Sequence, residues 1–401
     1  MMSATRLTVE ELIMRAQRLS EALSSEATEY DRTGKANFSA FERISQQRLG
    51  ALRVPPQYGG AGATVPELAT LVMALAKGDP SVAQAMLPHF VFVERTRLMA
   101  TEAQCDRFLR QVAAGVLVGG ASAELSGAFR GEVRTRLTRQ ESAYRLNGEK
   151  HYSTGALMGQ LLKVLALDDN GEAVLAVIPS DRAGVIRHDD WSGMGQRGTL
   201  SGRTELQDVW VEEHEVMRVQ QWQQQRHHTG AASQIIHCAI ETGIAQAALA
   251  DAAGWARSRV RAVKESGKPQ GNKDPYLLHK VGEIAARTHS AEALVLLAAD
   301  YIERAAQARF TDAPKETIEQ FAIEASVITA EAKAIANEAA LFASQTMFDV
   351  GGASMTLREY SFDRHWRNAR THTTHDPVAW KYRAIGDYRV NHRPPPISYL
   401  Y

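Results

Sequence analysis

Two histidines and a carboxylate near the C-terminus have the types and spacing that proton transfer needs. His372 and His375 lie three residues apart, and Asp376 and Pro377 follow directly. On a helical turn this spacing places both imidazoles on one face. Because histidine titrates near neutral pH, such a pair can accept or donate a proton during a reaction. The alternatives are a pair that caps helix-end carbonyls and a weak metal site.

A metal site would need more ligands than this pair provides. No His-x-x-Glu-His or Cys-x-x-Cys run accompanies the two histidines, so we predict no bound metal. Arg257, Arg259 and Arg261 form a basic cluster that either contacts a phosphate in a bidentate manner or is a solvated helix end. The glycine-rich run at 53–63 lacks the Lys-Ser/Thr ending and the preceding strand of a phosphate loop.

Composition and charge exclude several classes of protein. Lys+Arg and Asp+Glu both number 46, so no net field attracts nucleic acid or an anionic membrane surface. Cys105 and Cys238 are too few for a disulfide framework, which favours a reducing cytoplasm. The first residues lack an apolar signal-peptide region, and no stretch approaches the length of a membrane span. We therefore expect an unprocessed, soluble, cytoplasmic protein.

Hydrophobic periodicity divides the 401 residues into three parts. Apolar residues recur three and four apart over 1–116, which predicts an N-terminal helical domain. The period changes to two over 117–217, as at 133–137, which predicts a middle antiparallel β-barrel domain. Helical spacing returns from about 228 to 350. The region 218–401 is therefore predicted to be an antiparallel four-helix bundle with a tail.

Local patterns add detail to this division. Asn147-Gly148 predicts a β-hairpin, because a type I′ turn needs positive φ at both central residues. Apolar stripes at 236–247, 284–298 and 323–334 predict long packed helices. Such bundles often associate through a second apolar face, so we expect a homo-oligomer, with a tetramer favoured. The stiff tail at 394–401 is a candidate for contact with a neighbouring subunit.

Three segments carry a resemblance to a known family. The order of helical unit, β unit and helical bundle is that of the acyl-CoA dehydrogenase fold, and residues 144–156 resemble the strand-turn-strand signature of that superfamily. Residues 189–211 and 362–391 resemble a subfamily that contains dibenzothiophene monooxygenase and the sulfur-acquisition oxidoreductases of sulfone-using bacteria. The match extends from about residue 50 to 391. It implies a two-component flavin monooxygenase that receives reduced flavin from a separate reductase.

The resemblance assigns roles to several side chains. Tyr152 and Thr154 stand where the family places residues against the flavin, and Trp191 offers a flat face to the ring. Ser122 is a candidate for binding the flavin phosphate or ribitol. His89 matches a pocket histidine of the sulfur enzymes. The alternatives are a strand hydroxyl for Thr154, a core indole for Trp191 and a packed imidazole for His89.

The same alignment shows departures from the family pattern. The stretch at 348–355 has lost residues that hold the adenosine half of FAD, so FMN is favoured over FAD. One of Arg257, Arg259 and Arg261 is expected to contact the flavin phosphate. Gly120 stands where the monooxygenases tend to carry an asparagine, and Val93 where a phenol is expected in the aromatic-sulfur enzymes.

These residues lead to one favoured function and two alternatives. The favoured function is oxidation of a small organosulfur compound with O2 through a flavin C4a-hydroperoxide. His375 would manage the peroxide proton, with His372 in support and His89 in the pocket. The first alternative is an FAD-dependent acyl-CoA dehydrogenase with Asp376 as base, since His375-Asp376 replaces the family's Tyr-Glu pair. The second is a flavin-binding oligomer without turnover.

Overall fold

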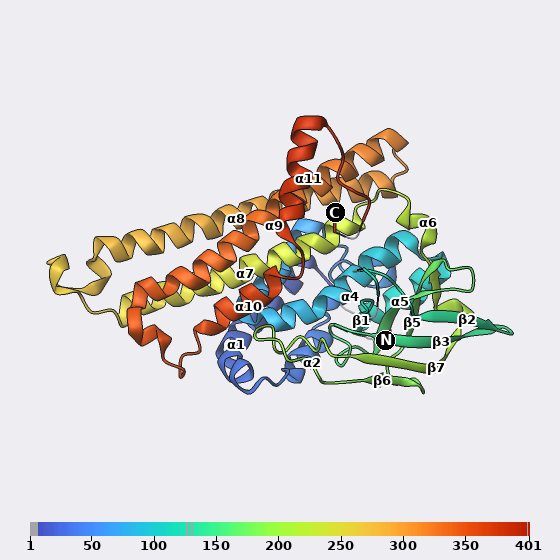
Figure 1. The fold of residues 1–401 in the computed structure, drawn as a ribbon, viewed down its shortest axis with the longest axis horizontal. Coiled ribbons are helices and arrows are strands. Elements are labelled where there is room, and N and C mark those ends of the chain that lie inside the picture. Colours follow the sequence, from blue (N-terminus) through green and yellow to red (C-terminus); the bar gives the residue numbers. More distant parts are fainter. Residues whose placement is uncertain (1–6, 126, 130, 399) are drawn as a thin grey trace.

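Helices build the first part of the chain in the computed structural model, which describes residues 7–125, 127–129, 131–398 and 400–401. These helices cover the N-terminal part that periodicity predicted to be helical (Figure 1). Two short 3-10 segments, at 49–51 and 56–58, occupy the turn-rich region between the second and third helices. The α-helices are α1 (Val9–Thr33), α2 (Phe38–Gln46), α3 (Val65–Gly78), α4 (Pro80–Met99) and α5 (Glu102–Ala113).

Polar caps determine where these helices begin. Thr64 and Glu67 form a reciprocal capping box at the start of α3, and Thr101 and Gln104 form another at the start of α5. The Asp79 carboxylate accepts hydrogen bonds from the first amides of α4. Each cap satisfies backbone amides that have no partner within the helix. The start of α4, which carries site residues described below, is therefore fixed.

The middle part is one sheet with mainly antiparallel pairing. Its hydrogen-bonded path runs β6-β7-β3-β2-β4-β5-β8, with β1 added beside β4. Only the β1–β4 and β2–β4 pairs among those described are parallel. The predicted antiparallel character is confirmed, and the described pairs join in an open path from β6 to β8. The strands are β1 (Val118–Ala121), β2 (Arg136–Gln140), β3 (Ala143–Lys150), β4 (Leu161–Leu167), β5 (Ala173–Pro179), β6 (Val185–Arg187), β7 (Thr204–Glu212) and β8 (Val216–Arg218).

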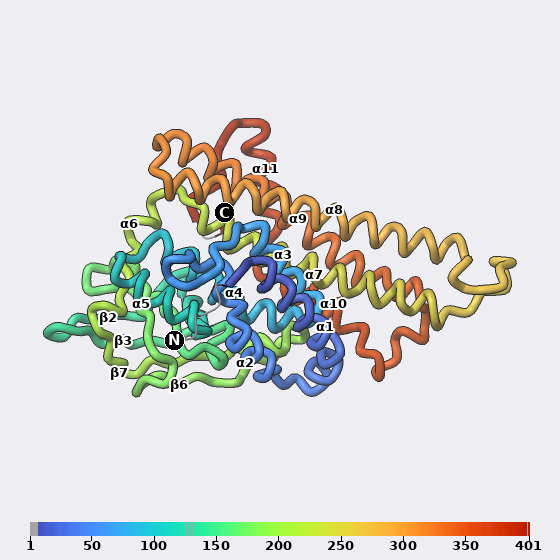
Figure 2. The backbone as a smooth tube through the Cα atoms, turned by 180° about the vertical axis from the view of Figure 1, so that it is seen from behind, coloured from blue at the N-terminus to red at the C-terminus, as the bar shows by residue number. Residues whose placement is uncertain are grey.

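Three long helices dominate the C-terminal part. They extend beyond the rest of the molecule, away from the sheet (Figure 2). Buried alanines and isoleucines lie along their contacts, which confirms the predicted bundle. Among the described residues, no helix is long and apolar enough to cross a membrane. The helices are α6 (Gln220–Gln223), α7 (Thr229–Ser258), α8 (Pro275–Phe310), α9 (Lys315–Gly351), α10 (Asp363–Thr373) and α11 (Val378–Asn391).

The N-terminal and C-terminal helices share one hydrophobic core. A single cluster contains buried side chains of α1, α3 and α4 together with those of α7, α8 and α9. A second cluster joins α4 and α5 to one face of the sheet through β1, β4 and β5. Helix α4 therefore contacts both the sheet and the bundle (Figure 1). A side chain on α4 can therefore contact either the sheet or the C-terminal helices.

The predicted hairpin at Asn147-Gly148 is wrong. Both residues lie within the continuous strand β3, and the register against β7 shifts between Leu146 and Gly148. Gly148 has a φ of 153°, as a bulge in the strand requires. The turn lies instead between Gln140 and Ala143, where Glu141 adopts a φ of 53°. The glycine signal marked an irregular strand position rather than a chain reversal.

The C-terminal tail packs on its own chain. Tyr401 donates a hydrogen bond to the carbonyl of Trp380 (2.7 Å), and Arg226 donates one to the carbonyl of Pro395 (2.7 Å). Lys381 donates to the carbonyl of Leu400. These contacts join the tail to α11 and to the segment before α7. These contacts hold the tail on its own chain, and its contact with a neighbouring subunit stays a prediction.

Glycines of α7 predict opposite responses to alanine. A Cβ at Gly243 would lie 2.6 Å from Cβ of Ala76 and 2.7 Å from the carbonyl oxygen of Met73, where α7 crosses α3. At Gly254 the nearest atom would be 3.9 Å away. We therefore expect Gly243→Ala to lower the melting temperature and Gly254→Ala to raise it, since alanine gains about 1 kcal/mol over glycine in a helix. Thermal unfolding of both variants tests the crossing, and an unchanged Gly243→Ala protein would contradict it.

Candidate functional site

His237, which sequence reasoning missed, lies between the two predicted histidines. His372 is in the last turn of α10, and His375 and Asp376 follow in the turn before α11. Nδ1 of His237 on α7 lies 3.0 Å from Nε2 of His372. The His237 ring centroid is 4.3 Å from that of His375. Three imidazoles from two helices and a turn thus form one cluster.

A buried ion pair fixes the orientation of this cluster. Nζ of Lys333 on α9 lies 2.9 Å from Oε1 of Glu241 on α7, and neither side chain is exposed. The same carboxylate oxygen accepts a hydrogen bond from Nδ1 of His372 (2.9 Å). A neutral Nε2 of His372 then accepts from Nδ1 of His237. Oε1 of Gln84 on α4 also lies 3.0 Å from this Nε2, and turning the carboxamide over would bring its NH2 group there as a donor.

The charges in this cluster follow from burial and pairing. Burial opposes ionisation of Glu241, but the positive charge of Lys333 and the His372 hydrogen bond outweigh it and lower the pKa of the carboxyl. The charge of Glu241 likewise raises the pKa of Lys333 despite its burial. Burial lowers the pKa of His372 and, more strongly, that of His237. Both histidines are therefore neutral beside a charged pair.

Asp376 is tied to its neighbour and closed off from solvent. Its side chain is 0% exposed, whereas that of His375 is 41% exposed. Nδ1 of His375 donates to Oδ1 of Asp376 (3.1 Å). Burial disfavours the carboxylate, yet the His375 hydrogen bond and nearby positive charges, including Lys333, lower the pKa of Asp376. Asp376 is consequently a weak base that orients the exposed His375 ring.

The residues predicted to face a planar cofactor gather at the end of β3 and in the loop before β7. Tyr152 has a φ of 54°, and its exposed ring meets Trp191 edge-on with centroids 6.1 Å apart. The hydroxyl of Thr154 lies 2.9 Å from that of Ser201. Ser122 follows β1, and its carbonyl accepts from the buried Lys150. The structure therefore brings Tyr152, Thr154 and Trp191 together, with Ser122 near the same strand.

Polar atoms beneath this surface lack partners. Oγ of Ser153 and both terminal atoms of the Gln196 side chain are buried, and no hydrogen-bond partner for them is found among the described residues. Unpaired buried polar atoms are uncommon in native proteins and often mark a ligand site. Glu124 is instead fully engaged, accepting from Lys150 (2.5 Å) and from Thr135. It holds the loop after Ser122 as a structural anchor.

Two contacts join the cofactor-facing residues to the histidine cluster. A Cβ at Gly155 would lie 2.5 Å from the carbonyl oxygen of Ala85, so the turn that holds Thr154 packs against α4 beside Gln84. The side chain of Asn368 accepts from the amide of Gln196 (2.6 Å). Asn368 lies one turn before His372 on α10. Helix α10 thus contacts the cofactor-facing residues through Asn368 and the histidine cluster through His372.

His89 and the arginine cluster lie elsewhere. His89 is fully buried, with Nε2 3.1 Å from the carbonyl of Gly50 and Nδ1 3.2 Å from the amide of Val118. Burial lowers the pKa of His89 to about 4, and these backbone contacts favour the packing alternative. Its role in a substrate pocket remains a prediction. Arg257, Arg259 and Arg261 are exposed at the far end of α7, remote from the sheet of the same chain (Figures 1 and 2).

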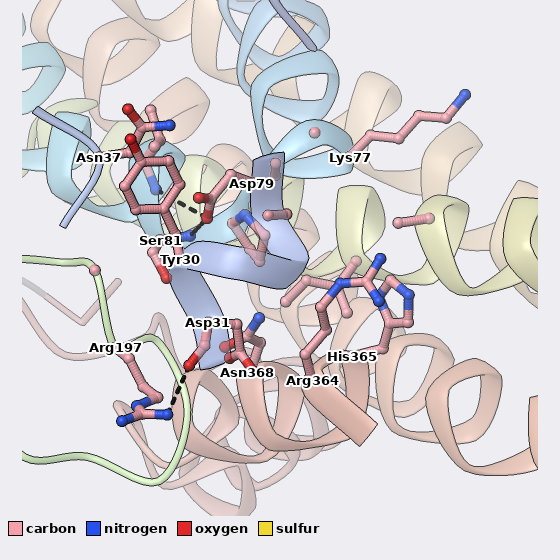
Figure 3. Close-up of a pocket in the computed structure, with 18 of the residues that line it drawn as sticks. Tyr30, Asp31, Asn37, Lys77, Asp79, Ser81, Arg197, Arg364, His365 and Asn368 are labelled. Carbon is pink, nitrogen blue, oxygen red and sulfur yellow. Dashed lines mark hydrogen bonds between the residues drawn. The ribbon is translucent and has the colours of Figure 1, made fainter. Parts of the chain in front are cut away.

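A small pocket beside α10 contains none of the predicted site residues (Figure 3). Two of its arginines are already engaged. Arg197 donates to the carbonyl of Asp31 (2.6 Å), and Arg364 pairs with Asp251 (3.2 Å). Asn368 of α10 also lines this pocket. We assign the chemistry to the histidine cluster, because that cluster combines exposed and buried proton-transfer groups.

Sequence reasoning missed four members of the site, namely Gln84, His237, Glu241 and Lys333. A signal was present on α7, where His237 and Glu241 lie four residues apart in an otherwise apolar, alanine-rich helix. Polar residues on a buried helix face need partners. Lys333 and Gln84 carried no comparable signal, since each lies on a different helix.

Comparison with known proteins identifies the family. The acyl-CoA dehydrogenase N-terminal domain matches residues 10–116, and the acyl-CoA dehydrogenase C-terminal domain matches residues 235–380. A dibenzothiophene monooxygenase of Rhodococcus erythropolis is 33% identical over 390 residues, which cover 94% of this chain and 92% of that protein. The chain belongs to the acyl-CoA dehydrogenase family.

Other members of the acyl-CoA dehydrogenase family resemble the chain along its length. A probable FMNH2-dependent monooxygenase, SfnC of Pseudomonas putida, is 26% identical over 96% of both chains. The FMN-bound structure of TdsC from Paenibacillus sp. A11-2 has a TM-score of 0.89 at 29% identity, covering 97% of this chain and 100% of that one. The methanesulfinate monooxygenase MsuC of Pseudomonas fluorescens also has a TM-score of 0.89, at 28% identity, covering 97% and 99%.

The ion pair predicts a non-additive response to mutation. Lys333→Met leaves the Glu241 carboxylate buried without its counter-charge, which we expect to cost about 3–5 kcal/mol of unfolding free energy. Glu241→Gln added to Lys333→Met keeps an acceptor for His372 and should recover part of that loss. Arg389→Met, which breaks an exposed pair with Glu331, should lower the free energy of unfolding far less than Lys333→Met. Denaturant unfolding measures all three, and additive losses would refute the coupling.

Proposed function

We propose that this protein is a monooxygenase that uses reduced FMN and O2 to oxidise a small organosulfur compound. The observation that supports this is the state of Asp376, which takes the place of the base in the dehydrogenases. Its carboxylate is buried, bonded to His375 and of lowered pKa. A group in this state is poorly suited to abstract a substrate proton. The exposed His375 is the group suited to proton transfer.

The chain offers a plausible surface for FMN. Tyr152 and Trp191 present aromatic faces, Thr154 and Ser122 present polar groups, and the unpartnered Ser153 hydroxyl lies beneath them. When bound there, reduced FMN would supply the electrons that activate O2. Relatives that carry FMN or FMNH2 in their names support this choice of cofactor over FAD.

The chain's own residues would manage protons and water around that reaction. Asp376 accepts a hydrogen bond from Nδ1 of His375, which would leave Nε2 of His375 as the nitrogen available to the reacting atoms. Neutral His237 packs against His375 and adds no charge that would compete for the proton. The surrounding apolar core excludes water, which favours oxygen transfer to sulfur over release of hydrogen peroxide.

Two partners follow from this proposal. Reduced flavin would come from a separate reductase, as expected for an FMNH2-dependent enzyme. Since Arg257, Arg259 and Arg261 lie far from Thr154 in one chain, contact of these arginines with the cofactor phosphate would require a second subunit. A homo-oligomer, with a tetramer favoured, would provide it.

The proposal predicts the effect of removing the exposed imidazole. We expect His375→Ala, supplied with reduced FMN and O2, to oxidise organic sulfides at least about tenfold more slowly and to release more hydrogen peroxide per FMN consumed. His279→Ala, which removes an exposed histidine on α8, is the matched control. Sulfoxide formation and peroxide release are measured together. Unchanged coupling in His375→Ala would show that the role assigned to His375 is wrong.

A second assay separates the proposal from the dehydrogenase alternative. Acyl-CoA esters are added without oxygen to protein loaded with oxidised flavin. A dehydrogenase with Asp376 as base would bleach the flavin absorbance, whereas the proposed enzyme leaves it unchanged. Bleaching would refute the proposed function, and flavin binding without either reaction would favour the non-catalytic oligomer.

A further inference from the structure

Two buried or partly buried cations lie together without an acidic partner. Lys163 on β4 is 4% exposed, and Arg95 on α4 is partly buried. Burial and, after it, the positive charge of Arg95 both lower the pKa of Lys163. Neither forms an ion pair with any acid of the described ranges. The nearest acidic neighbour along α4, Glu94, is already paired with Arg53 and Arg97.

Helix geometry places Arg95 on the same stripe of α4 as the site. Gln84, Pro88 and Arg95 are separated by four and seven residues, which correspond to about one and two helical turns. Gln84 contacts His372 at one end of this stripe. Arg95 therefore lies about 16 Å from Gln84 along the helix axis, at about 1.5 Å per residue. The stripe leads from the histidine cluster to the cations.

The sheet places Lys163 against the same stripe. Lys163 pairs in register with Gly120 of β1, so their side-chain positions face the same way. A Cβ at Gly120 would lie 2.9 Å from Cβ of Pro88. Lys163 thus faces α4 at the middle of the stripe. Its neighbours two residues away on the strand, Leu161 and Leu165, pack in the cluster that contains Phe92.

Helix α7 closes the opposite side. His228 at its start lies 3.5 Å from Glu94, whereas Glu241 lies near Gln84 through His372, so α7 runs antiparallel to α4. Gln234 falls between these two contacts. Its Oε1 is buried, and no hydrogen-bond partner for it is found in the described part of the chain. Gln234 therefore lies in the part of α7 that runs beside α4 between these two contacts.

A buried cation without a counter-charge destabilises a protein, so its presence calls for a ligand. His227, beside Arg95, has a pKa lowered by burial to about 4, so it adds no further charge. Gly120 pairs with Lys163 and has no side chain, so no side chain of β1 packs beside Lys163 at this position. The region thus combines positive charge, a hydrogen-bonding amide and low solvent exposure, which suits an oxyanion.

We propose that Arg95 and Lys163 bind an anionic group of the substrate, a carboxylate, sulfinate or sulfonate. This inference rests on the proposed function and narrows it to organosulfur anions. The anionic group lies toward the Arg95 end of α4, and the sulfur lies toward His375. A neutral aromatic sulfide would leave the two cations unpaired.

Matched substrates and variants test this proposal. The substrates are 3-(methylthio)propionate and its uncharged amide, together with 2-(methylthio)ethanesulfonate and the neutral dimethyl sulfoxide. We expect the wild-type enzyme to favour the anion of each pair in kcat/KM. Lys163→Met and Arg95→Met should raise the KM for the anions about tenfold to a hundredfold and so remove the preference for the anion of each pair. Arg107→Met, which removes an exposed cation on α5, should change neither.

Thermal unfolding gives a readout without turnover. In the absence of flavin, millimolar 3-(methylthio)propionate should raise the melting temperature of the wild type but not of Lys163→Met. Lys163→Met alone should melt higher than the wild type, because it removes an unpaired buried charge. This measurement remains informative if one variant turns over poorly.

The outcomes separate the anion site from the proposed function. Coupled oxidation of the neutral amide and dimethyl sulfoxide with no preference for anions would refute the anion site and leave the monooxygenase intact. Weaker FMN binding in Lys163→Met, with unchanged KM for anions, would also refute it, since the cations would then hold the cofactor phosphate. Anion-dependent thermal stabilisation without any oxidation would support the anion site and refute the monooxygenase.

Discussion

The buried ion pair between Lys333 and Glu241 is the constraint on which the site depends. It joins α9 to α7 inside the core shared by the two helical parts. Because each charge stabilises the other, both remain ionised without solvent. The carboxylate then fixes the proton of His372 on Nδ1, and His372 in turn orients His237. His237, which packs against His375, is kept neutral chiefly by its burial.

The arrangement explains why the site lies where three parts of the fold meet. Helix α4 contacts the sheet on one side and α7 on the other, so it connects the cofactor-facing turn at Thr154 with the histidines. Helix α10 makes the second connection through Asn368 and His372. The acyl-CoA dehydrogenase fold thus provides the framework, and within it the Asp376 carboxylate orients the His375 imidazole.

The sequence predicted what local patterns determine. Periodicity located the helices and strands, and the spacing of His372 and His375 identified one edge of the cluster. Tertiary contacts could not be predicted, so His237, Glu241 and Lys333 were missed, although they lie in helices that were expected. Asn147-Gly148 has the residues of a turn, yet pairing with β7 kept it in a strand as a bulge. His89 was expected to line a pocket, but its backbone contacts became visible only in three dimensions.

The central claim concerns the position of protons on His372 and His237, which nitrogen-15 NMR of histidine-labelled protein measures directly. Single substitutions, His372→Asn and His237→Asn, assign the signals. At pH 7 both rings should be neutral with the proton on Nδ1, and both should stay neutral as the pH falls to 6, since burial lowers their pKa values. A His372 ring that is doubly protonated at pH 7, or that carries its proton on Nε2, would contradict the account.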